Sequence, residues 1–129
     1  MPNFYGKTIL VIEDEKPMRE ALVNRFTNEG FFRVYEAPDG EIGLKMALEK
    51  LPDIIVLDLL MPKMNGLEML KKLRGDAWGK KAPVIILTAL EEDDEINKVI
   101  SKHEPSFYLV KTNVTPSDVV AKVAEVIGA

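Results

Sequence analysis

The run Ile54-Ile55-Val56-Leu57-Asp58 places a carboxylate directly after four successive apolar residues. Three other apolar runs also end at polar side chains: residues 8–12 before Glu13 and Asp14, residues 84–87 before Thr88, and residues 107–110 before Lys111. Strands that are apolar on successive residues are typical of a parallel sheet covered on both faces. Because the carboxyl ends of parallel strands meet at one edge, these polar side chains are predicted to gather there.

Short apolar runs alternate along the chain with longer segments of helical period. The expected strands are residues 7–12, 32–36, 54–58, 84–88 and 107–111. Five intervening segments show the i, i+3, i+4, i+7 spacing of one buried helix face, which in the second comprises Leu44, Ala47, Leu48 and Leu51. Strand followed by helix, repeated in this way, predicts an α/β fold with a parallel sheet. The second strand alternates apolar and polar residues and fits a sheet edge.

Length and composition limit the classes of protein to which the chain can belong. Its 129 residues predict one domain over residues 1–129, with residues 1–6 as a short N-terminal extension. The absence of cysteine and the single histidine exclude disulfides, thiolate metal sites and multi-histidine metal sites. The net charge of -4 argues against direct nucleic-acid binding. No apolar stretch approaches the roughly 20 residues of a membrane span, and no secretory signal is visible, so we expect a cytoplasmic protein without membrane insertion.

The predicted cluster of carboxylates favours a divalent cation. Three acids within a few ångströms repel one another, and this repulsion raises at least one pKa unless a cation lies between them. Mg²⁺ is a hard ion that takes one or two carboxylates, keeps water ligands and bridges to phosphate oxygens. Lys111 would add a positive charge and Thr88 a hydrogen-bond donor. The sequence therefore predicts a site for Mg²⁺ and a phosphoryl group.

Four motifs together resemble the receiver domain of two-component response regulators. They are Val11-Ile12-Glu13-Asp14-Glu15, Asp58-Leu59-Leu60-Met61-Pro62-Lys63-Met64-Asn65-Gly66, Thr88-Ala89 and Tyr108-Leu109-Val110-Lys111. The resemblance covers nearly the whole chain, and the spacing between motifs fits as well as the motifs do. It implies a chemotaxis-regulator-like, flavodoxin-like fold: a doubly wound five-stranded parallel sheet in the order 2-1-3-4-5, with five helices on both faces.

The same resemblance implies a role for each acid. Asp58 would be the phosphoacceptor that takes a phosphoryl group from the phosphohistidine of a histidine kinase or a phosphotransfer protein. Asp14 and Asp58 would bind Mg²⁺ together with the backbone carbonyl of Leu60, while Glu13 would act mainly through water.

The resemblance also implies how a signal would leave the site. Thr88 and Lys111 would contact phosphoryl oxygens, and Thr88 and Tyr108 would form a switch. Their movement would change the face made by helix four, strand five and helix five, where a downstream protein effector would bind. The protein would be a monomer or a phosphorylation-dependent dimer.

Two departures from the family pattern bear on the site. The residue after Lys111 is Thr112 instead of the usual proline, which follows a cis peptide bond in the family. The bond before Thr112 is therefore trans, or cis at a cost of about 3–4 kcal/mol. Leu60 and Leu90 flank the route of water to a phosphorylated Asp58, and neither can orient a water by hydrogen bonding. We expect the phosphorylated form to hydrolyse slowly by itself.

The leading interpretation is a phospho-accepting switch and not a turnover enzyme. The chain ends shortly after the fifth expected helix, so it would be a stand-alone receiver, a phosphorelay intermediate or a receiver excised from a larger regulator. An aspartate-nucleophile phosphatase dependent on Mg²⁺ is less favoured, because it needs a general acid two residues after the nucleophile, where this chain has Leu60. A flavin or nucleotide module is disfavoured by the acidic segment 13–17 after strand one.

Overall fold

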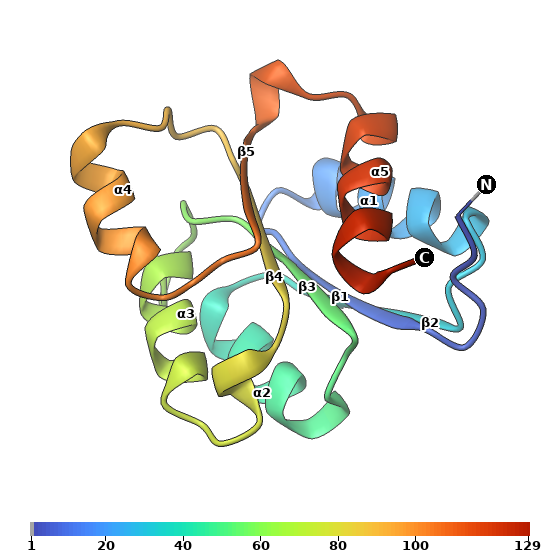
Figure 1. Ribbon diagram of the computed structural model, residues 1–129, viewed down its shortest axis with the longest axis horizontal. Coiled ribbons are helices and arrows are strands. Elements are labelled where there is room, and N and C mark those ends of the chain that lie inside the picture. Colours follow the sequence, from blue (N-terminus) through green and yellow to red (C-terminus); the bar gives the residue numbers. More distant parts are fainter. Residues whose placement is uncertain (1) are drawn as a thin grey trace.

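The computed structural model describes residues 2–129, and its elements alternate between strands and helices (Figure 1). The strands are β1 (Thr8–Ile12), β2 (Arg33–Ala37), β3 (Ile54–Leu57), β4 (Val84–Thr88) and β5 (Phe107–Val110). The α-helices are α1 (Lys16–Asn28), α2 (Gly40–Lys50), α3 (Gly66–Arg74), α4 (Asp94–Ser101) and α5 (Pro116–Ile127). Short 3-10 helices, η1 (Gly79–Lys81) and η2 (Lys111–Asn113), precede β4 and follow β5. The observed strands agree with the predicted ones to within one residue at each end.

The strands form one parallel sheet in the order β2-β1-β3-β4-β5, which confirms the α/β prediction and the strand order. β2 lies at an edge, as its alternating pattern predicted. Ile12 of β1 lies beside Leu57 of β3, so Glu13 and Asp58 leave the sheet side by side. Thr88 of β4 lies beside Val110 of β5, next to Lys111. The register therefore brings the polar side chains to one edge.

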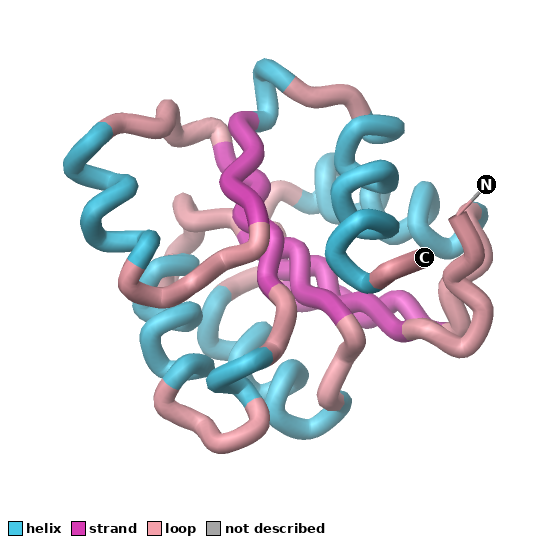
Figure 2. Tube along the Cα trace, in the orientation of Figure 1, coloured by secondary structure: helices cyan, strands magenta, loops and turns pink. Residues whose placement is uncertain are grey.

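Two helical layers cover the sheet, one on each face (Figures 1 and 2). On one face α1 and α5 pack through residues such as Phe26 and Val123 against Ile9 and Ile85. On the other face α2, α3 and α4 pack against a second cluster that includes Leu57. Both faces of the central strands are buried, which explains why their sequences are apolar on successive residues.

The buried face of α2 differs from the predicted one. Leu48 and Leu51 were expected to be buried, but they are 39% and 50% exposed. Ala47 is buried and Leu44 is half-buried, as predicted, and the helix also buries Gly40 and Gly43. A Cβ atom on Gly43 would lie 2.6 Å from the Ile12 side chain, so the backbone of α2 lies almost directly on β1. The prediction was wrong for Leu48 and Leu51 because it looked for large apolar residues, whereas small residues permit this close approach.

Side chains of the connecting loops fix where the helices begin. The N-cap residues Asp39, Asn65, Asp93 and Thr115 each accept a hydrogen bond from a backbone N–H of the first helical turn. In α5 the cap is a reciprocal capping box with Asp118, followed by Pro116 at the first helical position.

The expected N-terminal extension, residues 1–6, begins at Met1, which lies outside the described residues. Within the extension Phe4 is buried and its ring stacks on that of Phe31, with centroids 4.4 Å apart. No helix among residues 2–129 has the length and apolar character that crossing a membrane requires.

Candidate functional site

Three carboxylates meet at the carboxyl edge of the sheet. Glu13 and Asp14 follow β1 and Asp58 follows β3, and one oxygen of each lies within 4.8 Å of the others. Glu13 and Asp58 are only 2% and 4% exposed, whereas Asp14 is open to solvent to a greater extent. The site thus has two buried acids at its floor and a third at its solvent side.

Lys111 places its ammonium group between the two buried acids. Its Nζ atom lies 2.5 Å from Oε1 of Glu13 and 3.0 Å from Oδ2 of Asp58. A third carboxylate, that of Glu15, lies 3.6 Å away. Every peptide bond among the described residues is trans, so the bond before Thr112 is trans as well. Lys111 therefore points into the acidic cluster although the usual proline is absent.

Burial and hydrogen bonding within the cluster shift the pKa values of its two buried acids in opposite directions. Desolvation, together with the neighbouring Asp58, raises the pKa of Glu13 to about 8. Desolvation also acts on Asp58, but hydrogen bonding to Glu13, Thr88, the Leu60 amide and Lys111 outweighs it and lowers the pKa of Asp58. Desolvation would lower the pKa of Lys111, yet its two acidic partners raise that pKa to about 12. At neutral pH Asp58 is therefore the ionised acid facing an ammonium group.

The loop after β3 holds Asp58 through its backbone. The N–H of Leu60 donates to Oδ1 of Asp58 at 3.1 Å, which orients the carboxylate. Gly66, the first residue of α3, donates its N–H to the carbonyl of Leu59 at 3.0 Å. A Cβ atom on Gly66 would lie only 2.1 Å from the carbonyl oxygen of Asp58. Only glycine allows α3 to begin this close to the acid.

Arg19 is a residue of the site that the sequence analysis did not identify. From α1 it donates to the backbone carbonyls of Glu13 and Asp14, at 2.8 and 3.4 Å, and to the carboxylate of Glu36, at 3.1 Å. These contacts hold the acidic loop after β1 against α1. The sequence does not predict this role, because an arginine on the polar side of a helix is ordinary and its bonding partners are known only from the folded structure.

Thr88 and Tyr108 lie beside the cluster and are linked through Leu90. Thr88 is fully buried, and its Oγ1 accepts a weak hydrogen bond from the N–H of Leu90 at 3.4 Å. The Tyr108 hydroxyl donates to the carbonyl oxygen of Leu90 at 2.8 Å. Burial and the nearby acidic residues raise the pKa of this hydroxyl, so it stays protonated and can donate.

The donor set of the cluster fits a magnesium ion. All candidate side-chain ligands are carboxylate oxygens, the type that Mg²⁺ prefers. Oε2 of Glu13 is buried and has no hydrogen-bond partner in the part of the chain that the structure describes. A bound cation or its water ligands would satisfy such an atom, which is otherwise costly to bury.

Comparisons with known proteins agree with this geometry. The family model of the response regulator receiver domain matches residues 9–124. Among curated relatives, the phosphate regulon regulator PhoB of Pseudomonas aeruginosa is 30% identical over 122 residues, which are 95% of this chain and 52% of PhoB. PhoP of Bacillus subtilis, a regulator of alkaline phosphatase synthesis, is 34% identical over 95% of this chain and 49% of its own length. The chain thus spans about half the length of these two relatives.

Solved structures show the same likeness over at least 90% of both chains. The chemotaxis protein CheY4 of Vibrio cholerae matches with a TM-score of 0.85 and 26% identity, over 93% of this chain and 98% of its own. CheY of Borrelia burgdorferi, solved in a complex with CheX, BeF₃ and Mg²⁺, matches with a TM-score of 0.83 and 27% identity, over 95% and 90% of the two chains. Sheet order, site geometry and family match agree, so this chain belongs to the response regulator receiver domain family of two-component systems.

Proposed function

We propose that the chain is a phospho-accepting switch in which Asp58 takes a phosphoryl group from the phosphohistidine of a histidine kinase or a phosphotransfer protein. The observation that carries the proposal is the 3.0 Å contact of Lys111 Nζ with the buried Asp58 carboxylate, next to the two other acids of the cluster, Glu13 and Asp14. An ionised carboxylate at the open end of a sheet, with a cation on one side, is arranged to attack phosphorus and not merely to cap a helix.

The transfer itself requires little covalent help from the protein. An oxygen of Asp58 forms a bond to phosphorus while the bond from phosphorus to the imidazole nitrogen of the donor breaks. The electron pair of that bond stays on the imidazole, which then binds a proton. The protein contributes in-line positioning and stabilisation of charge on the transferred group.

Individual side chains would supply these contributions. Lys111 would contact one phosphoryl oxygen, moving from its present position between Glu13 and Asp58. The buried Thr88 hydroxyl would donate to a second oxygen. Asp14, Asp58 and the backbone carbonyl of Leu60 would hold Mg²⁺, which would supply positive charge to the transferred group. Glu13, whose pKa is raised and whose Oε2 has no hydrogen-bond partner among the described residues, would take part mainly through water.

The output of the switch would begin at Thr88. If its hydroxyl turns toward a phosphoryl group, the hydrogen bond from the Leu90 amide is lost and the loop after β4 moves. Tyr108, which bonds the carbonyl of Leu90, then changes position with that loop. The face made by α4, β5 and α5 would change its shape, and a downstream protein effector would recognise it.

The proposal also covers where the protein would act, its oligomeric state and what it would catalyse. The protein would act in the cytoplasm, as a monomer or as a dimer formed on phosphorylation. It would work alone, as a phosphorelay intermediate or within a larger regulator. The match to about half the length of PhoB and PhoP is compatible with each of these roles. It would catalyse only its own phosphorylation and dephosphorylation. A phosphatase is disfavoured because Leu60 stands where a general acid is needed, and turnover of a phosphomonoester would decide against the switch.

Intact mass spectrometry tests the proposal directly. We expect incubation with phosphoramidate and Mg²⁺ to add one phosphoryl group, and we expect neither Asp58→Asn nor the metal-free protein to gain it. Asp94→Asn is the matched control, because Asp94 is an exposed aspartate in the first turn of α4 and should be phosphorylated normally. Absence of the added mass in the folded wild-type protein, or its persistence in Asp58→Asn, would overturn the proposal.

A further inference from the structure

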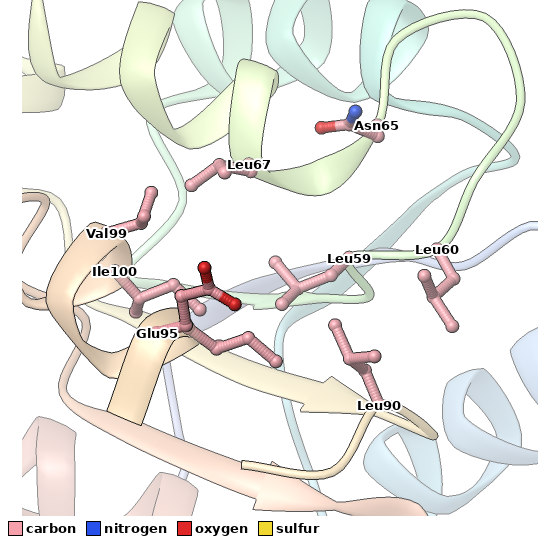
Figure 3. A pocket seen from close by; sticks show the side chains of 9 residues that line it. Leu59, Leu60, Asn65, Leu67, Leu90, Glu95, Val99 and Ile100 are labelled. Carbon is pink, nitrogen blue, oxygen red and sulfur yellow. The ribbon is translucent and has the colours of Figure 1, made fainter. Parts of the chain in front are cut away.

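An apolar groove runs between α3 and α4, next to the site (Figure 3). Its volume is about 420 Å³, within the range of ligand pockets. Seven of its nine lining residues are leucine, isoleucine or valine. Two of them, Leu60 and Val99, are 51% and 42% exposed, so the groove presents apolar surface to solvent.

The groove has one charged lining residue and an acidic rim. Glu95 lines it, and Figure 3 shows the Glu95 side chain reaching over it from α4. Residues 91–94, all acidic, connect the lining residues Leu90 and Glu95, and the segment 91–95 is here called the acidic rim. None of the ion pairs among residues 2–129 involves the segment 91–95. Five carboxylates without ion-pair partners among the described residues therefore stand in one segment that adjoins the groove at both ends, through Leu90 and Glu95.

An apolar lining next to unpaired carboxylates favours a binding partner that is both apolar and basic. An amphipathic helix with aliphatic side chains at i, i+3 or i+4, and i+7 fits an apolar groove. Lysine or arginine side chains beside that stripe would lie against the acidic rim. A second copy of the chain is disfavoured, because its net charge of -4 would bring further negative charge to this rim.

The groove is connected to the phosphorylation site by two hydrogen-bonded residues. Leu60 contributes its side chain to the groove and its N–H to Oδ1 of Asp58. Leu90 contributes its side chain to the groove, while its backbone bonds both Thr88 and Tyr108. An occupant that packs on these two leucines would lie over the approach to Asp58 and would restrain the loop that joins the two switch residues.

We propose that this groove binds a basic amphipathic helix of a partner protein, and that the bound helix protects a phosphoryl group on Asp58 from water. The second part rests on the proposed function. Hydrolysis requires a water oxygen to bond to phosphorus as the bond from phosphorus to the Asp58 oxygen breaks. The carboxylate recovers the electron pair, and the water proton leaves with phosphate or solvent. A helix over Leu60 and Leu90 excludes that water.

The binding part is tested on the unphosphorylated protein, so its outcome does not depend on phosphorylation. The probe is a synthetic helical peptide with leucines at i, i+3 and i+7 flanked by lysines, titrated to about 1 mM. Methyl NMR spectra of leucine and valine are expected to shift at Leu60, Leu67, Leu90 and Val99. The same peptide with glutamate in place of lysine should bind at least about tenfold more weakly.

Substitutions at Val99 and Leu48 test whether the peptide binds in the groove or on another apolar surface. Val99→Asp should weaken binding about tenfold, whereas Leu48→Asp, at a similarly exposed leucine on α2, should leave it unchanged. Glu95→Lys should weaken binding of the lysine peptide and strengthen binding of the glutamate peptide. Shifts that map elsewhere, equal binding by Val99→Asp, or no shifts at all would overturn the proposal. Shifts that depend on protein concentration without peptide would assign the groove to a second copy.

The protection part is tested by the lifetime of the phosphorylated protein. Saturating lysine peptide should lengthen the half-life of phospho-Asp58 several-fold in the wild type and leave it unchanged in Val99→Asp. An unchanged half-life with the peptide bound would refute the protection part of the proposal and leave the binding part standing. If no phosphorylated protein forms, the proposed function fails while the binding result still stands.

Discussion

The hydroxyl of Tyr108 donates a hydrogen bond to the carbonyl oxygen of Leu90 at 2.8 Å, which joins β5 to the loop after β4. The same leucine bonds Thr88 through its amide and lines the groove between α3 and α4. A single loop residue therefore contacts Thr88 and Tyr108 and also lines the groove. In the proposed switch, a movement of Thr88 would reach Tyr108 and the groove through Leu90.

Tyr108→Phe removes the hydroxyl and leaves the ring in place. We expect the free energy of unfolding to fall by about 1 kcal/mol, because the half-buried carbonyl of Leu90 loses its partner. Urea unfolding monitored by circular dichroism measures this change. Tyr5→Phe is the matched control, since Tyr5 is 88% exposed and its substitution should leave stability unchanged. Equal stability of Tyr108→Phe and the wild type would show that the hydrogen bond is not significant in solution.

Glu13 predicts a pH dependence of stability in the metal-free protein. Its pKa is raised from 4.5 to about 8 in the folded state, so the folded protein keeps a proton that the unfolded chain releases. Stability from this group is therefore lost as the pH rises from about 4.5 and levels off above about 8, where both states are ionised. Glu13→Gln should remove this contribution.

The measurement is the urea midpoint in EDTA at pH values from about 5 to 8. The decline should be steeper in the wild type than in Glu13→Gln, and Glu49→Gln, at an exposed glutamate of α2, should follow the wild type. Saturating Mg²⁺ should reduce the decline, because a cation favours ionised Glu13. Parallel curves for the wild type and Glu13→Gln would contradict the raised pKa.

Gly66→Ala should destabilise the protein by about 1–3 kcal/mol, the usual cost of overpacking. The new Cβ would lie 2.1 Å from the carbonyl of Asp58, so either α3 or the acid must move. Phosphorylation by phosphoramidate should slow as a consequence. Gly75→Ala provides the control, because its nearest contact would be 3.4 Å and its φ of -79° suits alanine. Similar unfolding midpoints for the two variants would argue against the close approach at Gly66.

Leu60→Asn and Leu90→Glu should each shorten the half-life of the phosphorylated protein. Both leucine side chains line the groove beside Asp58, and neither can orient an attacking water. The polar replacements can accept or donate hydrogen bonds to water and so favour in-line attack. The decay of the phosphorylated mass after removal of phosphoramidate gives the rate, with Leu48→Asn as control. Unchanged rates in both variants would show that water access does not limit hydrolysis.

The positions of the strands along the chain, and whether a strand is buried on one face or on both, were predictable from local sequence alone. Whether a strand is buried on one face or two is encoded in its own alternation of residues, so β2 could be assigned to an edge. The order of the strands came from a family resemblance and is confirmed. The buried face of α2 was not predictable by the same means. Periodicity detects large apolar residues, but Gly40 and Gly43 are buried because β1 and the loop after β3 approach them closely.

The sequence by itself determined which groups reach the carboxyl edge: Glu13, Asp14, Asp58, Thr88 and Lys111 each end or follow a strand. Only the tertiary structure decided how they interact. Lys111 bonds Glu13 and Asp58 across 98 and 53 residues of chain, and Arg19 secures the acidic loop from another element. Charge interactions depend on distances of a few ångströms and on exclusion of water. Those distances arise when strands pair and helices close over them, which no local pattern specifies.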